Sequence, residues 1–157
     1  MEDERRGSGE DLQRVAGGLE ELEASGVVLD TDVLVSDLRG KTSILGDLEG
    51  KGPATTVVNA FELFHGAYKS KETSANLSAA RGLLSSLRVV GLSLKAAERA
   101  GEVLARSQRS GDALEVRDLL IGCIAREEGL SLVTYNVKHF RRIPGLRVVE
   151  AGQIADR

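Results

Sequence analysis

Three acidic residues stand at the polar ends of apolar segments, where a carboxylate contributes nothing to a hydrophobic core. They are Asp30, which follows the run 26–29; Glu62, the only charged residue in 57–64; and Asp118, which precedes the apolar stretch 119–125. Removing such acids from water is costly unless they are paired or bind a cation. Their placement therefore predicts a metal site.

The chemistry expected of such a site is hydrolysis assisted by a hard divalent cation. Mg²⁺ and Mn²⁺ prefer carboxylate, carbonyl and water oxygens, and usually keep open positions for phosphate and water. A structural zinc site is not indicated, because His65 and His139 do not form a His-x-x-x-His pair and Cys123 is the only cysteine. A bound cation of this kind can activate water to attack a phosphodiester.

Taken singly, each acid also has an ordinary explanation. Asp30 could cap a helix, Glu62 could lie on a helix surface, and Asp118 could pair with Arg117 or Arg126. Sequence spacing alone does not show that the three acids meet. The elements that would carry them decide between these readings.

Length and composition predict one ordinary domain with an aliphatic core. The chain has 157 residues, 41% hydrophobic and only 3% aromatic, without tryptophan. A formal net charge of -3 argues against a protein that coats nucleic acid, but leaves a nuclease open. A lone cysteine in an apolar helix fits the cytoplasm, and no apolar stretch is long enough for a membrane span.

The chain divides into a charged N-terminal segment and an α/β region. Residues 1–25 are expected to form an amphipathic helical extension, with apolar residues at spacings of three and four. From residue 26 to residue 157, short β-rich runs alternate with helical segments, which predicts helices on both faces of a mainly parallel sheet of four to five strands. The expected strands are 26–30, 54–58, 87–91, 131–134 and 146–150; the expected helices are about 32–38, 42–49, 59–70, 73–86, 93–109 and 113–128.

This arrangement would bring Asp30, Thr134 and Asn136 to one edge of the sheet. Each of them ends or follows a predicted strand. In an open parallel sheet, ligands bind beyond the carboxyl ends of the strands. A candidate site at that edge is therefore expected.

Four motifs in order resemble the PIN-domain family, especially the VapC-like toxin ribonucleases of type II toxin-antitoxin modules. They are Val28-Leu29-Asp30-Thr31-Asp32-Val33-Leu34, the segment 56–67 around Glu62, the segment 118–125 that begins at Asp118, and the segment 132–140 that contains Thr134, Asn136 and His139. The resemblance runs from about residue 26 to residue 150. It implies a three-layer α/β/α fold with Asp30, Glu62 and Asp118 as catalytic, metal-binding acids.

The chain departs from the resemblance at the fourth acidic position. Many relatives have an aspartate in the last segment, whereas this chain has Asn136 and His139. Asn136 still offers a neutral carbonyl oxygen, but the site loses one negative charge. The resemblance therefore implies one firmly held Mg²⁺ or Mn²⁺, with Thr134 and Asn136 as supporting residues.

Several neighbours have expected roles beside the acids. Thr31 and Thr134 carry hydroxyls that could orient Asp30, and Asp32 is expected to cap the first helical turn rather than contact metal. Asp112 or Glu115 could compensate for the missing fourth acid, with Glu115 three positions before Asp118 on the same helix.

A basic rim and aromatic residues could contact substrate. The basic candidates are Arg39, Lys41, Lys138, Arg141 and Arg142, although ordinary solvated surface explains each equally well. Tyr135 and Phe140 could stack on an unpaired base, but Phe140 fits better in the core. His139 could act as a general acid or lie in a loop or interface.

The predicted function is hydrolysis of RNA phosphodiester bonds by a metal-dependent endoribonuclease, the toxin of a toxin-antitoxin module. The resemblance implies a cytoplasmic homodimer silenced by a small antitoxin protein. One alternative is a noncatalytic PIN-like module that binds RNA or protein. Another is a phosphatase of the haloacid dehalogenase type, because Asp30-Thr31-Asp32 also resembles the nucleophile motif of that class.

Overall fold

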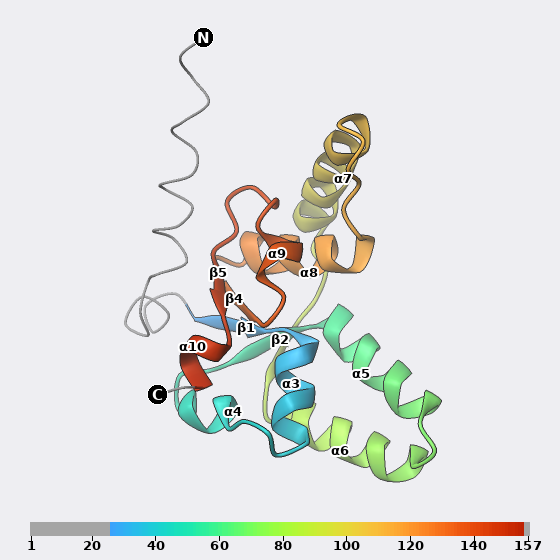
Figure 1. Ribbon diagram of the computed structural model, residues 1–157, viewed down its shortest axis with the longest axis vertical. Helices are drawn as coiled ribbons and strands as arrows, with labels where there is room; N and C mark the ends of the chain where they lie inside the picture. The colour runs from blue at the N-terminus through green and yellow to red at the C-terminus, as the bar shows by residue number, and fades with distance from the viewer. Residues whose placement is uncertain (1–25, 156–157) are drawn as a thin grey trace.

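A five-stranded parallel sheet forms the centre of the computed structural model, which describes residues 26–155 (Figure 1). The strand order is β3-β2-β1-β4-β5, and every neighbouring pair is parallel. The strands are β1 (Val27–Leu29), β2 (Ala54–Thr56), β3 (Arg88–Val90), β4 (Ser131–Thr134) and β5 (Val148–Glu150).

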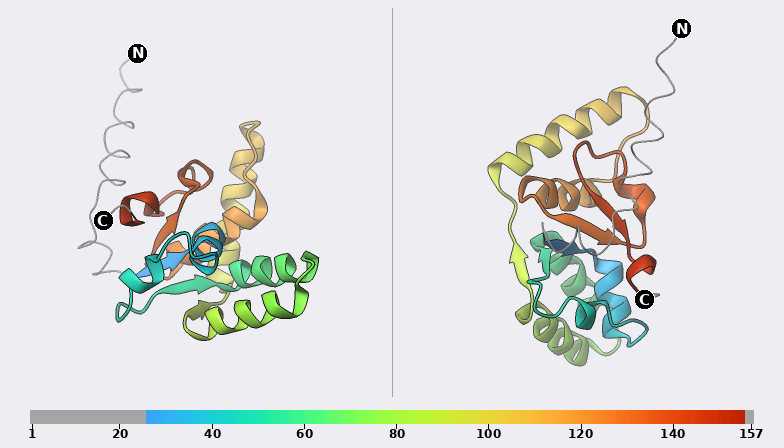
Figure 2. Two further views of the ribbon diagram at one scale, coloured as in Figure 1. Left: turned by 60° about the horizontal axis from the view of Figure 1, so that its bottom comes forward. Right: turned by 90° about the vertical axis from the view of Figure 1, so that its left-hand side faces the viewer.

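Helices cover both faces of the sheet (Figure 2). One layer contains α3 (Thr31–Leu38), α4 (Ile44–Asp47), α5 (Val57–Lys69), α6 (Thr73–Ser85) and α10 (Gly152–Ala155). The other contains α7 (Leu94–Arg109), α8 (Val116–Glu127) and α9 (Val137–Phe140). The expected three-layer α/β/α architecture is confirmed.

Side chains of the short strands alternate between two hydrophobic cores. On β1, Val28 packs into the core beneath α7 and α8, whereas Val27 and Leu29 pack into the core beneath α3. On β4, Leu132 packs into the core beneath α7 and α8, and Val133 packs into the core beneath α3. Successive strand residues point to opposite faces, so the central strand β1, which is buried on both faces, is apolar at every position.

Capping residues set helix starts that the sequence analysis placed wrongly. Thr56 caps α5 through a capping box with Asn59, so β2 ends at Thr56 and the helix begins at Val57, not at residue 59. Glu115 caps α8, which therefore begins at Val116 rather than 113. Strand β5 begins at 148 rather than 146, the short helices α9 and α10 were not predicted, and the expected helix 1–25 lies outside the described residues.

The order of strands places the candidate site at a switch point. After β1 the chain moves one way to β2 and β3, and then returns to lay β4 on the other side of β1. Leu29 of β1 pairs with Val133 of β4, and the Asp30 amide donates to the Val133 carbonyl at 3.0 Å. Asp30 and Thr134 therefore leave neighbouring strands side by side, where ligands of such sheets bind.

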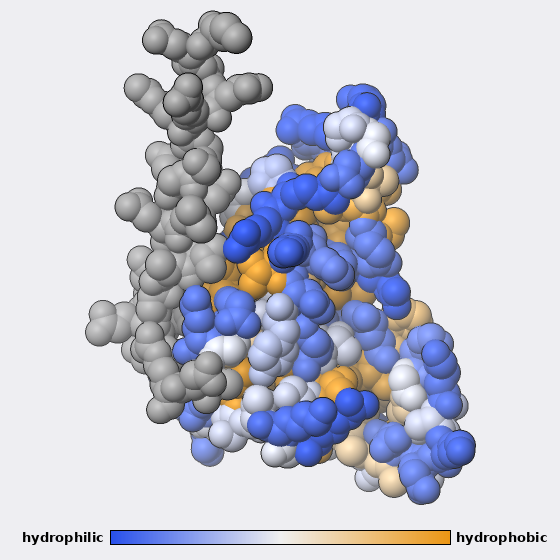
Figure 3. All heavy atoms as spheres, in the orientation of Figure 1, coloured by the Kyte–Doolittle hydropathy of each residue, from blue (hydrophilic) through white to orange (hydrophobic). Residues whose placement is uncertain are grey.

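The surface is mixed in character. The outer end of α7 is hydrophilic, whereas hydrophobic side chains reach the surface between α8 and α5 (Figure 3). Exposed large hydrophobic residues on α5, α7 and α8 include Val57, Phe61, Leu94 and Val116. Between residues 26 and 155, none of the helices combines the length and hydropathy that crossing a bilayer requires.

Candidate active site

Asp30 joins β1 to α3 and is held by three donors. Its Oδ1 accepts from the Thr31 amide at 2.9 Å and from Asn59 Nδ2 at 3.1 Å, and its Oδ2 accepts from Thr134 Oγ1 at 2.7 Å. Asp30 is also the N-cap of α3, and only 7% of its surface is exposed. A carboxylate held this way has a fixed orientation but still has unused lone pairs.

Asn59 is a buried residue that hydrogen-bonds three other residues of the site, and it was not among the residues predicted from the sequence. Its Nδ2 donates to Asp30 and, at 2.9 Å, to Thr31 Oγ1, while its Oδ1 accepts from the amide and the hydroxyl of Thr56. The side chain is fully buried, and its amide group is fully used. The signal that could have found it is the Thr-x-x-Asn spacing of a capping box inside an apolar run.

Glu62 lies on α5, one helical turn beyond Asn59, and faces the same region. Its Oε1 accepts from Thr31 Oγ1 at 3.1 Å, and Arg117 Nη1 lies 3.9 Å from its Oε2. Burial raises the pKa of Glu62, and the charges of Asp30 and Asp118 raise it further, against the lowering effects of Thr31 and Arg117. Glu62 is thus electrostatically coupled to both other acids.

Asp118 lies in the first turn of α8 and contacts His139. Its Oδ2 is 3.1 Å from His139 Nδ1. Burial raises the pKa of Asp118, as do the charges of Glu115 and Asp30, while His139 lowers it. Glu115 was expected on the same helix as Asp118, but it is the N-cap residue that precedes α8. Its Oε2 accepts a hydrogen bond from the Asp118 amide at 3.1 Å.

Asp32 has a different role from the predicted one, because Asp30 and not Asp32 caps α3. The Asp32 carboxylate instead reaches the turn after β4, where its Oδ2 accepts from the Tyr135 amide at 3.1 Å and from Asn136 Nδ2 at 3.2 Å. Burial and the neighbouring charge of Asp30 raise the pKa of Asp32 to about 6. Asp32 is therefore a fourth carboxylate at this edge of the sheet.

Replacing Asp32 with asparagine should stabilise the cation-free protein by about 1 to 2 kcal/mol near neutral pH, because it removes a charge held beside Asp30. The pKa of Asp32 in the folded protein, about 6, exceeds its ordinary value of 3.8, so the cost of the ionised carboxylate grows as pH rises through this interval and is fully present above it. Urea unfolding of both proteins near pH 4 and near pH 7 checks this. The same difference in the free energy of unfolding between the two proteins at both pH values would contradict this prediction.

The donor set suits a hard divalent cation. Asp30, Asp32, Glu62 and Asp118 offer carboxylate oxygens, and Asp32 Oδ1 is buried without a hydrogen-bond partner among the described residues. Within residues 26–155, no three His, Cys, Asp or Glu side chains are already grouped as ligands of one ion. Hydroxyl and amide groups lie between these like charges, so a bound cation would have to draw the carboxylates together.

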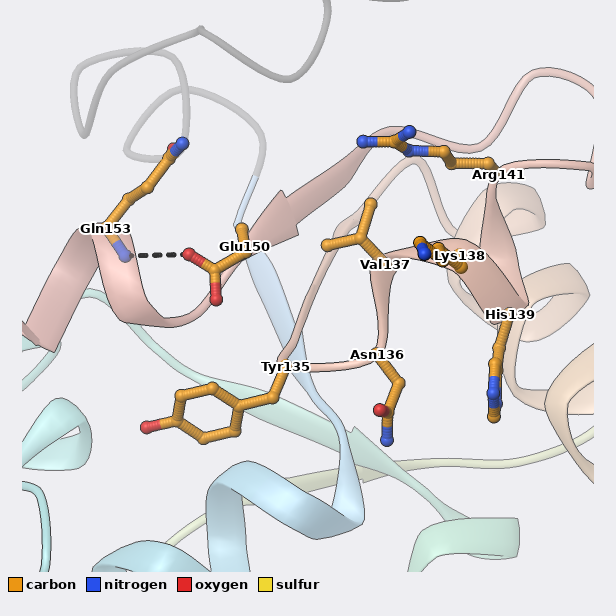
Figure 4. Close-up of a pocket in the computed structure, with 8 residues that line it drawn as sticks. All are labelled: Tyr135, Asn136, Val137, Lys138, His139, Arg141, Glu150 and Gln153. Atoms are coloured by element: carbon orange, nitrogen blue, oxygen red, sulfur yellow. Dashed lines mark hydrogen bonds between the residues drawn. The ribbon is translucent and has the colours of Figure 1, made fainter.

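An open pocket of about 380 Å³ lies at the β4–α9 turn (Figure 4). Two of its lining residues, Asn136 and His139, contact Asp32 and Asp118. Lys138 and Arg141 are among its lining residues, together with Asn136 and His139. A second pocket, of about 340 Å³, is lined by Thr31, Glu62, Lys69 and Arg117 among others. Basic groups therefore lie on both sides of the acidic centre.

Three residues of the expected rim, acidic and stacking sets can be placed in the fold. Arg142 and Asp112 form an exposed ion pair with each other, and their roles as rim group and compensating acid stay predictions. Phe140 is 1% exposed and belongs to the core beneath α8, so it cannot stack on a base. Tyr135 is half-buried and lines the pocket next to Asn136.

Residues 27–146 match the PIN domain family. This span contains strands β1 to β4 and ends just before β5. The chain belongs to the PIN domain family. The match includes Asp30, Glu62 and Asp118, and the resemblance drawn from the four sequence motifs is confirmed.

Named relatives of this PIN domain are bacterial ribonucleases. The chain is 30% identical over 124 residues to the tRNA(fMet)-specific endonuclease VapC of Salmonella typhimurium, an alignment that covers 77% of this chain and 94% of the relative. It is 34% identical over 118 residues to ribonuclease VapC10 of Mycobacterium tuberculosis, covering 73% and 85% of the two chains.

Solved structures with the same fold come from toxin-antitoxin complexes. DNA-bound VapBC from Salmonella typhimurium superposes with a TM-score of 0.71 at 30% identity, covering 78% of this PIN domain chain and 95% of the other. VapBC2 from Rickettsia felis, bound to a promoter DNA fragment, gives a TM-score of 0.70 at 31% identity, covering 79% and 96%. Membership of this fold argues against the phosphatase alternative.

Proposed function

We propose that this PIN domain, residues 26–157, is a divalent-metal-dependent endoribonuclease and the toxin of a toxin-antitoxin module. The observation that supports the proposal is the proximity of Asp30, which follows β1, to Glu62 on α5 and Asp118 on α8: the charge of Asp30 raises the pKa of both. The ribonuclease names of the relatives support RNA as the substrate.

Asp30 and Asp118 would hold the cation most directly, and Glu62 would bind it through water or orient the attacking water. When bound, a Mg²⁺ or Mn²⁺ ion supplies a Lewis acid that activates water and stabilises charge on the leaving oxygen. Thr134 keeps Asp30 oriented through its 2.7 Å hydrogen bond, and the Asn136 carbonyl oxygen can complete the pocket.

Glu62 is suited to accept a proton or hydrogen bond from the attacking water. Thr31 fixes one of its two oxygens through a 3.1 Å hydrogen bond, which orients the carboxylate for that contact. The other oxygen lies 3.9 Å from Arg117 Nη1, and Arg117 also pairs with Glu115 at 3.1 Å; its remaining N–H groups could contact a substrate phosphate. Lys69 and Lys138, in the flanking pockets, can hold neighbouring phosphates.

The direct test is incubation of the purified protein with a structured RNA pool in Mg²⁺, in Mn²⁺ or in EDTA. Cleavage in either metal and none in EDTA is expected, because the donor oxygens alone cannot activate water. Undiminished cleavage in EDTA would contradict the metal-dependent mechanism. Absence of cleavage with RNA still bound would favour the noncatalytic binding module instead.

The proposed partners are a second copy of the chain and an antitoxin protein. Solved relatives are VapBC complexes, which supports an antitoxin. Helices α5, α7 and α8 each expose an apolar side chain, Phe61, Leu94 and Val116 respectively, and a second copy could cover them. Light scattering of the purified protein measures its oligomeric state. The proposed location is the cytoplasm, where such an RNA substrate occurs. The free, buried thiol of Cys123 is compatible with that reducing compartment.

A further inference from the structure

Asp32 anchors the turn that follows β4. Three donors of that turn converge on Asp32 Oδ2: the Tyr135 amide at 3.1 Å, Asn136 Nδ2 at 3.2 Å and Thr134 Oγ1 at 3.4 Å. The Asn136 side chain points toward the start of α3, where Asp32 lies (Figure 4). One carboxylate oxygen is thus sufficient to hold the turn.

The other oxygen, Asp32 Oδ1, is buried and accepts no hydrogen bond from any residue between 26 and 155. Leaving a buried charged acceptor without a partner is costly, so such an atom calls for an explanation. Thr134 Oγ1 lies 2.7 Å from Asp30 Oδ2 and 3.4 Å from Asp32 Oδ2, so the two carboxylates flank a single hydroxyl. Asp32, whose Oδ1 has no partner, therefore belongs to the same site as Asp30.

The β4–α9 turn contributes no carboxylate at position 136. Asn136 is neutral, and its side chain donates directly to Asp32. The negative charge of this hydrogen-bonded pair therefore lies in the first turn of α3. Together with Asp30, Glu62 and Asp118, Asp32 makes four carboxylates at this edge of the sheet.

We propose that Asp32 supplies the fourth carboxylate of the cation site, with Oδ2 holding the β4–α9 turn and Oδ1 free to ligate a divalent cation or to accept from water bound to it. The inference rests on the proposed function, because it assumes that Asp30 and Asp118 bind such an ion. It assigns Asp32 a cation-binding role in addition to its contacts with the turn.

Titration calorimetry with Mn²⁺ alone, without RNA, separates the two roles. In Asp32→Asn the remaining oxygen can still accept from Tyr135, Asn136 and Thr134, so the fold and the turn are kept. We expect Mn²⁺ affinity to fall about tenfold, the scale of losing one supporting group of a metal site. Asp47→Asn, which removes an exposed aspartate on α4, is the matched control and should bind as the unmodified protein does.

Exchanging the side chains at positions 32 and 136 gives a second test, in which Mn²⁺ affinity is expected to recover. The double variant Asp32→Asn/Asn136→Asp keeps the net charge and allows the hydrogen bond between the two side chains to reverse, with Asn donating to Asp. Mn²⁺ affinity should return to within about threefold of the unmodified protein, because the negative charge is restored to the same hydrogen-bonded pair of side chains.

The outcomes are distinct. Asp32→Asn that binds Mn²⁺ as tightly as the unmodified protein, or a double variant as weak as the single one, would overturn the role of Asp32 and leave the proposed function intact. Failure of the unmodified protein to bind Mn²⁺, together with cleavage in EDTA, would overturn the proposed function itself. Weakening in the single variant with recovery in the double variant supports the inference.

Discussion

Asp118→Asn is expected to reduce RNA cleavage at least about 100-fold while leaving the protein folded, because it removes a cation ligand at the start of α8. The substitution is nearly isosteric, and one oxygen or the amide can keep the contact with His139, now 3.1 Å from Oδ2. It also removes a charge that burial and the neighbours Glu115 and Asp30 disfavour. Stability should therefore be unchanged or slightly higher.

Initial rates of cleavage under saturating Mg²⁺, measured beside urea unfolding curves, check this expectation. Asp47→Asn serves again as the control, since Asp47 is exposed and distant in sequence from every acid of the site. Equal rates for Asp118→Asn and the unmodified protein would refute the assigned role of Asp118. A fall in rate accompanied by unfolding would instead show that the carboxylate is structural.

Asn59→Ala is expected to lower the free energy of unfolding by about 3 kcal/mol and to impair cleavage at least about tenfold. The truncation leaves the Thr56 amide without its acceptor and takes a donor from both Asp30 and Thr31; Thr56 and Asp30 are buried, and Thr31 is half-buried. It also breaks the capping box that begins α5, the helix that carries Glu62.

The matched control is Asn76→Ala, which removes an exposed asparagine whose Nδ2 donates to Ser70 Oγ at 2.8 Å. That change should cost less than about 0.5 kcal/mol, because water replaces the lost partner. Urea unfolding and cleavage rates of both variants give the comparison. Similar stability of the two variants would show that the buried hydrogen bonds of Asn59 contribute little.

The sheet and the position of Asp30 were predictable because their signals are local. Short runs of β-branched residues mark β1 and β4, and parallel strands bring their carboxyl ends to one edge, so Asp30 and Thr134 were expected to meet. The apolar positions of α8 likewise placed each of its ends to within three residues.

The roles of Asn59 and Asp32 depended on contacts that no local pattern encodes. The run 54–64 is largely apolar, and its pattern does not show where β2 ends and α5 begins. The side-chain cap at Thr56 sets that boundary. The partners of Asp32 lie more than 100 residues away in the β4–α9 turn. Only the pairing of β1 with β4 brings them together.

The most direct test of the central claim, that Asp30, Glu62 and Asp118 form one cation site, is a crystal structure of the protein soaked in Mn²⁺ with anomalous scattering recorded from the metal. We expect an anomalous peak within ligand distance of the Asp30 and Asp118 carboxylates, at the carboxyl edge of β1, and its loss in Asp118→Asn. Under saturating Mn²⁺, no peak at this edge, or peaks only elsewhere on the protein, would contradict the claim.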